Sequence, residues 1–345
     1  MACHKEFMVA RNHQFCSIKD TTGLAGLLGI GEPLLYRLRF EKAYTVFEVK
    51  KKQGKSRLIE APQKELKVAL RRLNDYLQSS YFFNRTSSAY GFVQQPRNAK
   101  RKRNILTNAR LHSGKNYMLN VDLEDFFHQV SKGKVLTIFK SRPFSFQTEL
   151  AAFLAEFTTY NNRLPMGSPT SPALSNFSCI EMDRELETMA RSNKIIYSRY
   201  VDDLTFSSNE PIHAGIFNDI QQILTGHSYR INMKKVSWMG ETDQKIVTGL
   251  ILKDRPHVTA AFLNDLEKNL RRFKHVLEFS AVSVSGVSGE WIDNFKQHLQ
   301  GKLRFLQMVY GCNSPVYNKM SHLFADAFNT KPFAESFNWN NFPYF

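Results

Sequence analysis

Three aspartates are the residues of this chain best suited to chemistry. Asp122 follows a short apolar run at 116–121, and the pair Asp202 and Asp203 comes eighty residues later, between two runs rich in β-forming residues. Carboxylates held together at a hairpin tip repel one another unless a cation neutralises them, and oxygen-only ligands select Mg²⁺. Two such ions about 4 Å apart lower the pKa of an attacking hydroxyl and stabilise a leaving pyrophosphate. The aspartates therefore predict a two-metal site for phosphoryl transfer, although each alone could also be a turn residue or a helix cap.

The positive charge of the chain is concentrated in one stretch. The 345 residues include 47 Lys or Arg and 31 Asp or Glu, a net charge of +16. Residues 50–115 alone hold 17 basic and three acidic residues, a net charge of +14, with aromatic residues interleaved. Such a field attracts polyanions, and the basic run at 97–103 is expected to be an exposed loop. We infer contact with nucleic acid rather than a merely solvated face, and the Gln-Pro-Arg-Asn break disfavours an amphipathic membrane helix.

Composition and hydropathy exclude several classes of protein. Hydrophobic residues make up 42% of the chain and aromatic residues 13%, which suffices for a large core and excludes disorder. No apolar run approaches the roughly 20 residues that span a bilayer, and the first residues lack the apolar stretch of a signal peptide. The four cysteines show no Cys-x-x-Cys spacing, which suits a reducing compartment. We therefore expect a cytoplasmic protein with no membrane partner.

The elements that must position the aspartates follow from the apolar pattern. Alternation predicts one hairpin with strands at 44–50 and 56–60 and a second hairpin with strands at 195–200 and 204–207. A separate strand is predicted at 116–122. Helical spacing occurs at 21–40, 66–77, 132–140, 147–158, 172–191 and 263–277. The second hairpin would carry two acids at its tip. Helices mixed with antiparallel hairpins indicate the α+β class and not a doubly wound sheet.

Four motifs around these elements resemble those of the reverse transcriptases and stand in that family's order. They are Gly-Lys-Ser-Arg-Leu-Ile at 54–59, Leu-Asn-Val-Asp-Leu-Glu-Asp-Phe-Phe at 119–127, Leu-Pro-Met-Gly-Ser-Pro-Thr-Ser-Pro at 164–172 and Tyr-Val-Asp-Asp at 200–203. Two further blocks are typical of bacterial retron reverse transcriptases, namely Asn-Ala-Arg-Leu-His at 108–112 and Val-Thr-Gly at 247–249. The resemblance covers nearly the whole chain.

The resemblance implies a right-hand polymerase. N-terminal helices and basic fingers would occupy residues 1–115. A palm, with an antiparallel sheet, helices and the catalytic aspartates, would occupy 116–250. A helical thumb with an aromatic C-terminal tail would occupy 251–345. The charge count agrees with this division, since the fingers lie along the path of the template.

Catalytic roles are implied at the matching positions. Asp122, Asp202 and Asp203 would bind two Mg²⁺ ions, with Mn²⁺ as an alternative, and the carbonyl of Leu123 would assist. Lys235 would protonate the leaving pyrophosphate. The alternative for this lysine is an exposed side chain without a catalytic role.

The same resemblance implies a dNTP pocket. Arg57 would lie over the incoming nucleotide, and Lys51, or a lysine beside it, would meet the triphosphate. The ring of Phe127 would lie beneath the sugar and clash with a 2′-hydroxyl. Met166 and Gly167 belong to the pocket turn, and Met166 stands where the family usually carries Gln. Because a flexible thioether replaces a polar contact there, we expect altered fidelity or nucleotide affinity.

Recognition of RNA is assigned to the two retron-type blocks and to the basic run. The residues concerned are Asn108, His112, Val247, Thr248, Gly249, Arg101 and Arg103. Asn108 could instead cap or pack a turn, and Gly249 could be a backbone requirement between strands.

The resemblance finally implies an RNA-directed DNA polymerase of retron type. Such an enzyme copies part of its own structured non-coding RNA from the 2′-hydroxyl of a guanosine, and leaves a branched RNA–DNA product called multicopy single-stranded DNA. A host ribonuclease H would remove template RNA, and a separate effector protein would act with the enzyme in anti-phage defence. The alternatives are another bacterial reverse transcriptase, of the group II intron or diversity-generating type, and a catalytically idle RNA-binding scaffold that holds an effector.

Overall fold

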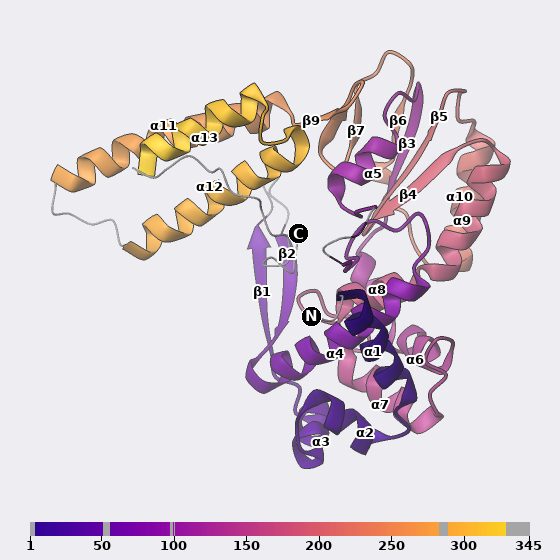
Figure 1. Ribbon diagram of the computed structural model, residues 1–345. Coiled ribbons are helices and arrows are strands. Elements are labelled where there is room, and N and C mark those ends of the chain that lie inside the picture. The colour runs from indigo at the N-terminus through magenta and orange to yellow at the C-terminus, as the bar shows by residue number, and fades with distance from the viewer. Residues whose placement is uncertain (1–3, 51–55, 97–98, 100, 283–288, 329–345) are drawn as a thin grey trace. The chain divides into compact units, whose positions relative to one another are not determined.

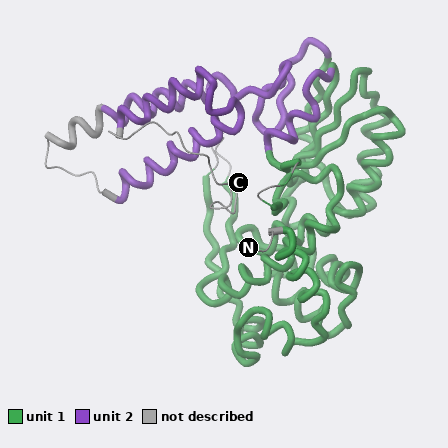
Figure 2. Tube along the Cα trace, in the orientation of Figure 1, with its two compact units in different colours: residues 1–104, 116–240, 344–345 green, residues 105–115, 241–343 purple. Residues whose placement is uncertain are grey.

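The computed structural model describes residues 4–50, 56–96, 99, 101–282 and 289–328 of the chain. The chain divides into two units (Figure 2), of which the first holds residues 1–104 and 116–240 and the second holds residues 105–115 and 241–343. The short segment 105–115 therefore leaves the first unit, and the chain then returns to it. The division into fingers, palm and thumb stays a prediction, because these units do not test it.

A four-stranded antiparallel sheet lies at the centre of the first unit. Its strands, in order across the sheet, are β4 (Ile196–Tyr200), β5 (Asp203–Ser208), β3 (Tyr117–Asp122) and β6 (Ser237–Met239). Leu119 on β3 and Phe206 on β5 pair in register and are fully buried. The helix α9 (Ile180–Ser192) packs against β4 and against α10 (Ala214–Gly226), and Figure 1 shows both helices beside the sheet. The predicted hairpin and the separate strand are thus neighbours in one sheet.

The first predicted hairpin is also present in the first unit. Its strands β1 (Tyr44–Lys50) and β2 (Ser56–Pro62) pair antiparallel along their whole length. The strand β2 ends at Pro62, which cannot donate a ladder hydrogen bond. The turn at 51–55, and with it the predicted triphosphate contact Lys51, lies outside the described residues.

Helices complete the first unit. They include α1 (His4–Ser17), α2 (Thr21–Leu28), α3 (Glu32–Phe40), α4 (Lys64–Asn84), α6 (Lys132–Lys140), α7 (Thr148–Thr158) and α8 (Ser171–Ser178). The apolar stripe of α4 is buried as predicted, with Leu66, Leu70 and Leu77 at 1% exposure or less. The single helix expected at 172–191 is wrong, because α8 ends at Ser178, α9 begins at Ile180, and Cys179 lies between them. Hydroxyls of Ser175 and Ser178 donate to carbonyls three residues earlier, which tightens the last turn of α8.

The second unit combines a small sheet with long helices. Its antiparallel strands are β7 (Lys245–Val247), β8 (Leu250–Leu252) and β9 (Pro256–His257), and its helices are α5 (Ile105–Leu111), α11 (Ala260–Val282), α12 (Gly289–Tyr310) and α13 (Pro315–Phe328). The helix α5 packs against β8 and β9, and α11 packs against α13. Leu266, Leu270 and Phe273 form the buried stripe predicted for α11. Antiparallel sheets with helices in both units confirm the α+β class.

No helix in the described part of the chain has both the length and the apolar character needed to cross a bilayer.

Candidate active site

The three aspartates come together at one end of the central sheet. Asp122 is the last residue of β3 and pairs in register with Asp203, the first residue of β5. Val201 turns the chain between β4 and β5 with a φ of 63°, a conformation that is unusual for a β-branched residue. The backbone N–H of Leu123 donates to the carbonyl of Asp202 at 3.0 Å, so the turn is bonded to the end of β3. We call Asp122, Asp202 and Asp203 the carboxylate site.

Burial and mutual repulsion both disfavour ionisation of Asp202 and Asp203 in the carboxylate site. Desolvation, followed by the charges of Asp202 and Asp122, raises the pKa of Asp203 to about 7. The pKa of Asp202 is also raised, by desolvation and then by the charge of Asp122, while Lys235 and Arg57 oppose that shift. The predicted nucleotide contact Arg57 therefore acts electrostatically on this site. Three ionised carboxylates at this position require a nearby cation.

Lys235 provides positive charge in this structure. It lies on the short 3₁₀ helix η2 (Met233–Lys235), and its Nζ donates to Asp122 Oδ1 at 2.6 Å. Asn232 Nδ2 lies 3.3 Å from the other carboxylate oxygen of Asp122. Partial burial opposes the charge on Lys235, but the bond to Asp122 and the other carboxylates raise the pKa of its ammonium group. The structure thus brings Lys235 to the carboxylate site, while its predicted proton transfer stays a prediction.

The donor set of the carboxylate site fits a hard divalent cation. Within the described ranges, no cluster of three or more His, Cys, Asp or Glu side chains forms a ready-made metal site. Asp122, Asp202 and Asp203 nevertheless offer only oxygen donors. A cation would offset the burial and the mutual repulsion that raise the pKa values of Asp202 and Asp203. The backbone of Leu123 directly follows Asp122, where its carbonyl was expected to assist.

The residues predicted to surround a nucleotide sugar also lie in the first unit. Phe127 is half-buried in the 3₁₀ helix η1 (Phe126–Gln129), whereas Phe126 is 3% exposed and belongs to the core. The ring centroid of Phe127 lies 6.1 Å from that of Phe92. The carbonyl of Met166 accepts a 2.7 Å hydrogen bond from the backbone N–H of Glu60, so the pocket turn is bonded to β2.

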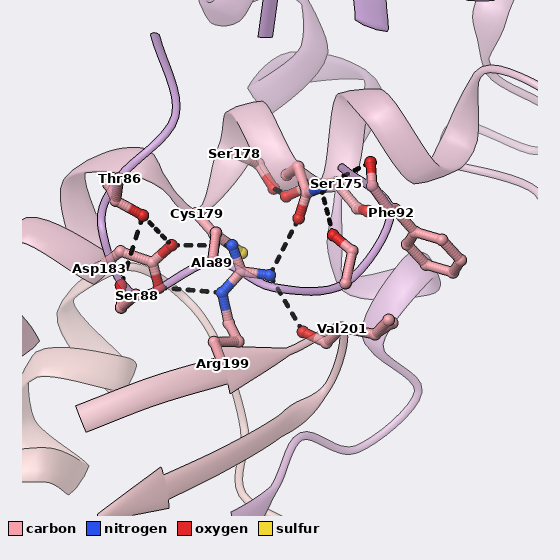
Figure 3. A network of polar contacts seen from close by, with 12 residues as sticks. Thr86, Ser88, Ala89, Phe92, Ser175, Ser178, Cys179, Asp183, Arg199 and Val201 are labelled. Carbon is pink, nitrogen blue, oxygen red and sulfur yellow. Dashed lines mark hydrogen bonds and ion pairs between the residues drawn. The ribbon is translucent and has the colours of Figure 1, made fainter. Parts of the chain in front are cut away.

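Figure 3 shows a buried polar network beside the turn at 200–203 that no sequence pattern predicted. The side chains of Arg199 and Asp183 are both 0% exposed. Arg199 Nε and Nη2 donate to the two carboxylate oxygens of Asp183 at 2.9 and 2.8 Å, a bidentate pair. Arg199 Nη1 donates to the carbonyl of Val201 at 3.1 Å. The network therefore holds the backbone that carries Asp202.

The same network extends to the segment 86–92. Asn176 accepts a 3.1 Å hydrogen bond from Arg199 Nη1 and donates to the carbonyl of Gly91 at 3.0 Å. A Cβ atom at Gly91 would lie 2.6 Å from the backbone nitrogen of Val201, so only glycine permits this approach. No local pattern could have revealed this, because Arg199 sits in an ordinary strand sequence and its partners come from other elements.

Residues assigned to RNA recognition fall into two groups. Asn108 and His112, on or just after α5, are each 1% exposed, and Val247 on β7 is fully buried. Burial lowers the pKa of His112 to about 3, so its imidazole is neutral. Thr248 and Gly249 form the turn between β7 and β8, with φ values of 48° and 81°. These residues share the second unit, and their contact with RNA stays a prediction.

The two arginines of the basic run differ in their surroundings. Arg101 is exposed, as expected for a loop that meets a polyanion. Arg103 is half-buried, and its Nη1 donates to the carbonyls of Ser87 and Ala89, the latter at 2.9 Å. Its guanidinium also lies 4.6 Å from the centroid of the Tyr90 ring. Arg103 therefore has a structural role in the first unit whether or not it contacts RNA.

Comparison with known proteins agrees with this geometry. Residues 49–252 match the family model described as reverse transcriptase (RNA-dependent DNA polymerase). The retron Ec86 reverse transcriptase of Escherichia coli is 34% identical over 226 residues, which are 64% of this chain and 65% of the relative. The retron Mx162 reverse transcriptase of Myxococcus xanthus is 26% identical over 337 residues, 87% of this chain and 66% of the relative. The chain thus spans just under two thirds of the length of these two relatives.

A solved telomerase structure from Candida albicans, in complex with a fragment of telomeric RNA, matches with a TM-score of 0.44 and 10% identity over 83% of this chain and 63% of that one. The family match does not depend on it, because the matched segment covers more than half of the chain and contains the carboxylate site, Phe127 and Met166. Helices and antiparallel sheets fit the right-hand polymerase fold, and the chain belongs to the reverse transcriptase family, with retron enzymes among its curated relatives.

Proposed function

We propose that this chain is an RNA-directed DNA polymerase of retron type. The observation that carries the proposal is the register of β3 and β5, which pairs Asp122 with Asp203 at the end of the sheet, next to Asp202. This arrangement lies inside the segment that matches the reverse transcriptase family. Relatives named as retron reverse transcriptases support the narrower type.

The carboxylate site would hold the divalent cations that reverse transcriptases generally use, and we propose Mg²⁺. Asp122, Asp202 and Asp203 would be the ligands, with the Leu123 carbonyl beside them. Bound cations supply Lewis-acid activation of the attacking hydroxyl and neutralise the leaving pyrophosphate. Lys235, whose ammonium group is 2.6 Å from Asp122, is proposed to donate a proton to that leaving group.

The nucleotide pocket is proposed on the neighbouring segments of the first unit. Arg57 would contact the incoming dNTP, since its charge already acts on Asp202. Phe127 would exclude the 2′-hydroxyl of a ribonucleotide. Met166 and Gly167, in the pocket turn at 164–172, would line the nucleotide pocket. Lys51 is proposed for the triphosphate, although it lies outside the described residues.

The retron type adds a specific substrate to this chemistry. The enzyme would copy part of a cognate structured non-coding RNA from the 2′-hydroxyl of one guanosine, leaving a branched RNA–DNA product. Asn108, His112 and the turn at 247–249 are proposed for recognising that RNA. A host ribonuclease H, a separate effector protein and a role in anti-phage defence complete the proposal by likeness to the family.

The decisive test compares two Asp-to-Asn variants. Asp203→Asn should lower DNA synthesis on a primed RNA template with dNTPs and Mg²⁺ by at least about a thousandfold, because metal ions contribute several kcal/mol to such reactions. Asp219→Asn, an exposed residue of α10, is the matched control and should remain active. Equal synthesis by both variants would exclude the proposed catalytic site, and a wild-type chain that binds RNA without synthesis would point to the scaffold alternative.

A second measurement addresses the retron type. Nucleic acid that copurifies with the chain from its native locus should contain one short DNA joined to RNA through a linkage that only a debranching enzyme cleaves. Heterogeneous RNA without attached DNA would contradict priming from a 2′-hydroxyl and would favour a different type of reverse transcriptase.

A further inference from the structure

Glu60 is a buried acid outside the carboxylate site. Its side chain, on β2, is 1% exposed, and each carboxylate oxygen has one donor. His128 Nε2 lies 3.2 Å from Oε2, and Arg163 Nη2 donates to Oε1 at 3.2 Å. Because a carboxylate only accepts hydrogen bonds, Nε2 of His128 must carry a proton in this contact. A charge buried this completely is retained only with such partners.

The backbone of Glu60 makes a second connection. Its N–H donates to the carbonyl of Met166 at 2.7 Å. The next residue, Gly167, has a φ of 130°, and a Cβ atom there would lie 2.9 Å from the carbonyl oxygen of Glu60. Any other residue would push the pocket turn away from β2. The backbone at position 60 therefore lies against the pocket turn, and the Glu60 side chain projects from this point of contact.

The partners of Glu60 belong to the segments proposed for the nucleotide pocket. Arg57 lies three residues earlier on the same strand. Phe127 directly precedes His128 in η1, so a bond to the His128 ring restrains the backbone from which the Phe127 ring projects. Arg163 directly precedes the turn that contains Met166. One buried carboxylate thus connects the three parts of the pocket.

We propose that Glu60 is a positioning residue that sets the sugar selectivity of the polymerase through His128 and the pocket turn. This inference rests on the proposed function. Glu60 would not touch the nucleotide. It would hold the Phe127 ring at the distance from Arg57 and Met166 at which a deoxyribose fits and a 2′-hydroxyl clashes. Without the carboxylate, the ring would gain room to move and a ribonucleotide would be admitted.

The test measures selectivity rather than activity alone. Glu60→Gln keeps the shape of the side chain but removes its charge and one acceptor oxygen. On a poly(rC) template with an oligo(dG) primer, the ratio of kcat/KM for dGTP to that for GTP should fall at least about tenfold. Glu65→Gln is the matched control, because Glu65 also pairs with an arginine, Arg37 at 2.8 Å, but is exposed. Its ratio should equal that of the wild type.

A second pair of variants covers the case in which Glu60→Gln does not fold. His128→Gln keeps an N–H donor for Glu60, and His128→Leu removes it at similar volume. The ratio of kcat/KM for dGTP to that for GTP should stay at the wild-type value in His128→Gln and should fall in His128→Leu. An equal loss of kcat/KM for both nucleotides, at an unchanged ratio, would show a purely structural role and overturn the inference. A wild-type chain that incorporates neither nucleotide would overturn the proposed function, and the selectivity role with it.

Discussion

Among the residues that the structure describes, Lys235 makes the closest ion pair with the carboxylate site. Lys235 and the neighbouring Lys234 on η2 are both exposed, but the ammonium group of Lys235 is bonded to Asp122 at 2.6 Å. Lys235→Met should lower the rate of DNA synthesis at saturating dNTP by about 10² to 10⁴-fold, the range typical of a lost general acid. Single-turnover primer extension measures this rate. Lys234→Met is the control, and equal rates for the two variants would remove Lys235 from the mechanism.

His112 gives the stability of the chain a dependence on pH. Burial lowers the pKa of its imidazole from 6.5 to about 3. Between these two values the unfolded chain binds a proton that the folded chain does not, so the free energy of unfolding falls as the pH drops below 6.5. The side chain in His112→Gln does not titrate, so the free energy of unfolding of this variant should decrease less between pH 7.5 and pH 5.0 than that of the wild type. Urea unfolding at the two pH values measures this difference. His13→Gln, at an exposed position, should keep the wild-type slope; a slope shared by both variants would contradict the assignment.

At the scale of elements, the Arg199 and Asp183 pair joins β4 to α9. Both side chains are fully buried, and Arg199 also bonds the Val201 carbonyl in the turn that carries Asp202. Arg199→Met should lower the free energy of unfolding by about 3–5 kcal/mol, because it leaves the Asp183 charge buried without its partner.

A matched control for this pair is available on the same helix. Arg184 forms an exposed ion pair with Glu181, and Arg184→Met should change the free energy of unfolding by no more than about 1 kcal/mol. Urea unfolding measures both values. A loss for Arg199→Met no larger than that of Arg184→Met would show that the buried pair does not stabilise the contact between β4 and α9.

Local apolar patterns account for the elements that were predicted, and hydrogen bonds that such patterns do not report accompany the features that were not. The strands at 44–50 and 116–122 and the stripe of α4 follow from short periodic runs. The runs in β3 and α4 are largely buried, whereas β1 is exposed along nearly its whole length. The break at Cys179 comes directly after a turn in which the Ser175 and Ser178 hydroxyls donate to backbone carbonyls, and apolar periodicity does not report such bonds. The buried pair of Arg199 and Asp183 was invisible for another reason, since a charged residue in a strand pattern normally faces water.

Some residues of the candidate site could be predicted from the sequence, and others could not. Asp122, Asp202 and Asp203 could be predicted because each ends or begins a β-like run, and register then brings them together. Glu60 could not, since its donors lie 68 and 103 residues away in the sequence. Its surroundings exist only once β2, η1 and the pocket turn have packed.

At the scale of the whole molecule, the charge is both large and uneven. The chain carries +16, and residues 50–115 account for +14 of it. Part of this charge is used internally, as Arg103 shows by bonding backbone carbonyls of the first unit. Arg101 and Lys102 are exposed instead, so their charges are available to a phosphate backbone. A polyanion bound there releases counterions, which makes its affinity depend on salt.

The salt dependence can separate a local contact from the effect of net charge. For a single-stranded RNA, each phosphate neutralised contributes a slope of about −0.7 to log K against log salt. Arg101→Gln with Lys102→Gln should make the slope shallower by about 1.4, if both side chains contact phosphates. Lys5→Gln with Lys19→Gln lowers the net charge equally, at exposed positions outside residues 50–115, and should leave the slope unchanged. Fluorescence anisotropy at salt concentrations from roughly 50 to 200 mM measures the slope for each double variant. An equal change of slope in both double variants would mean that net charge, and not the basic run, attracts the RNA.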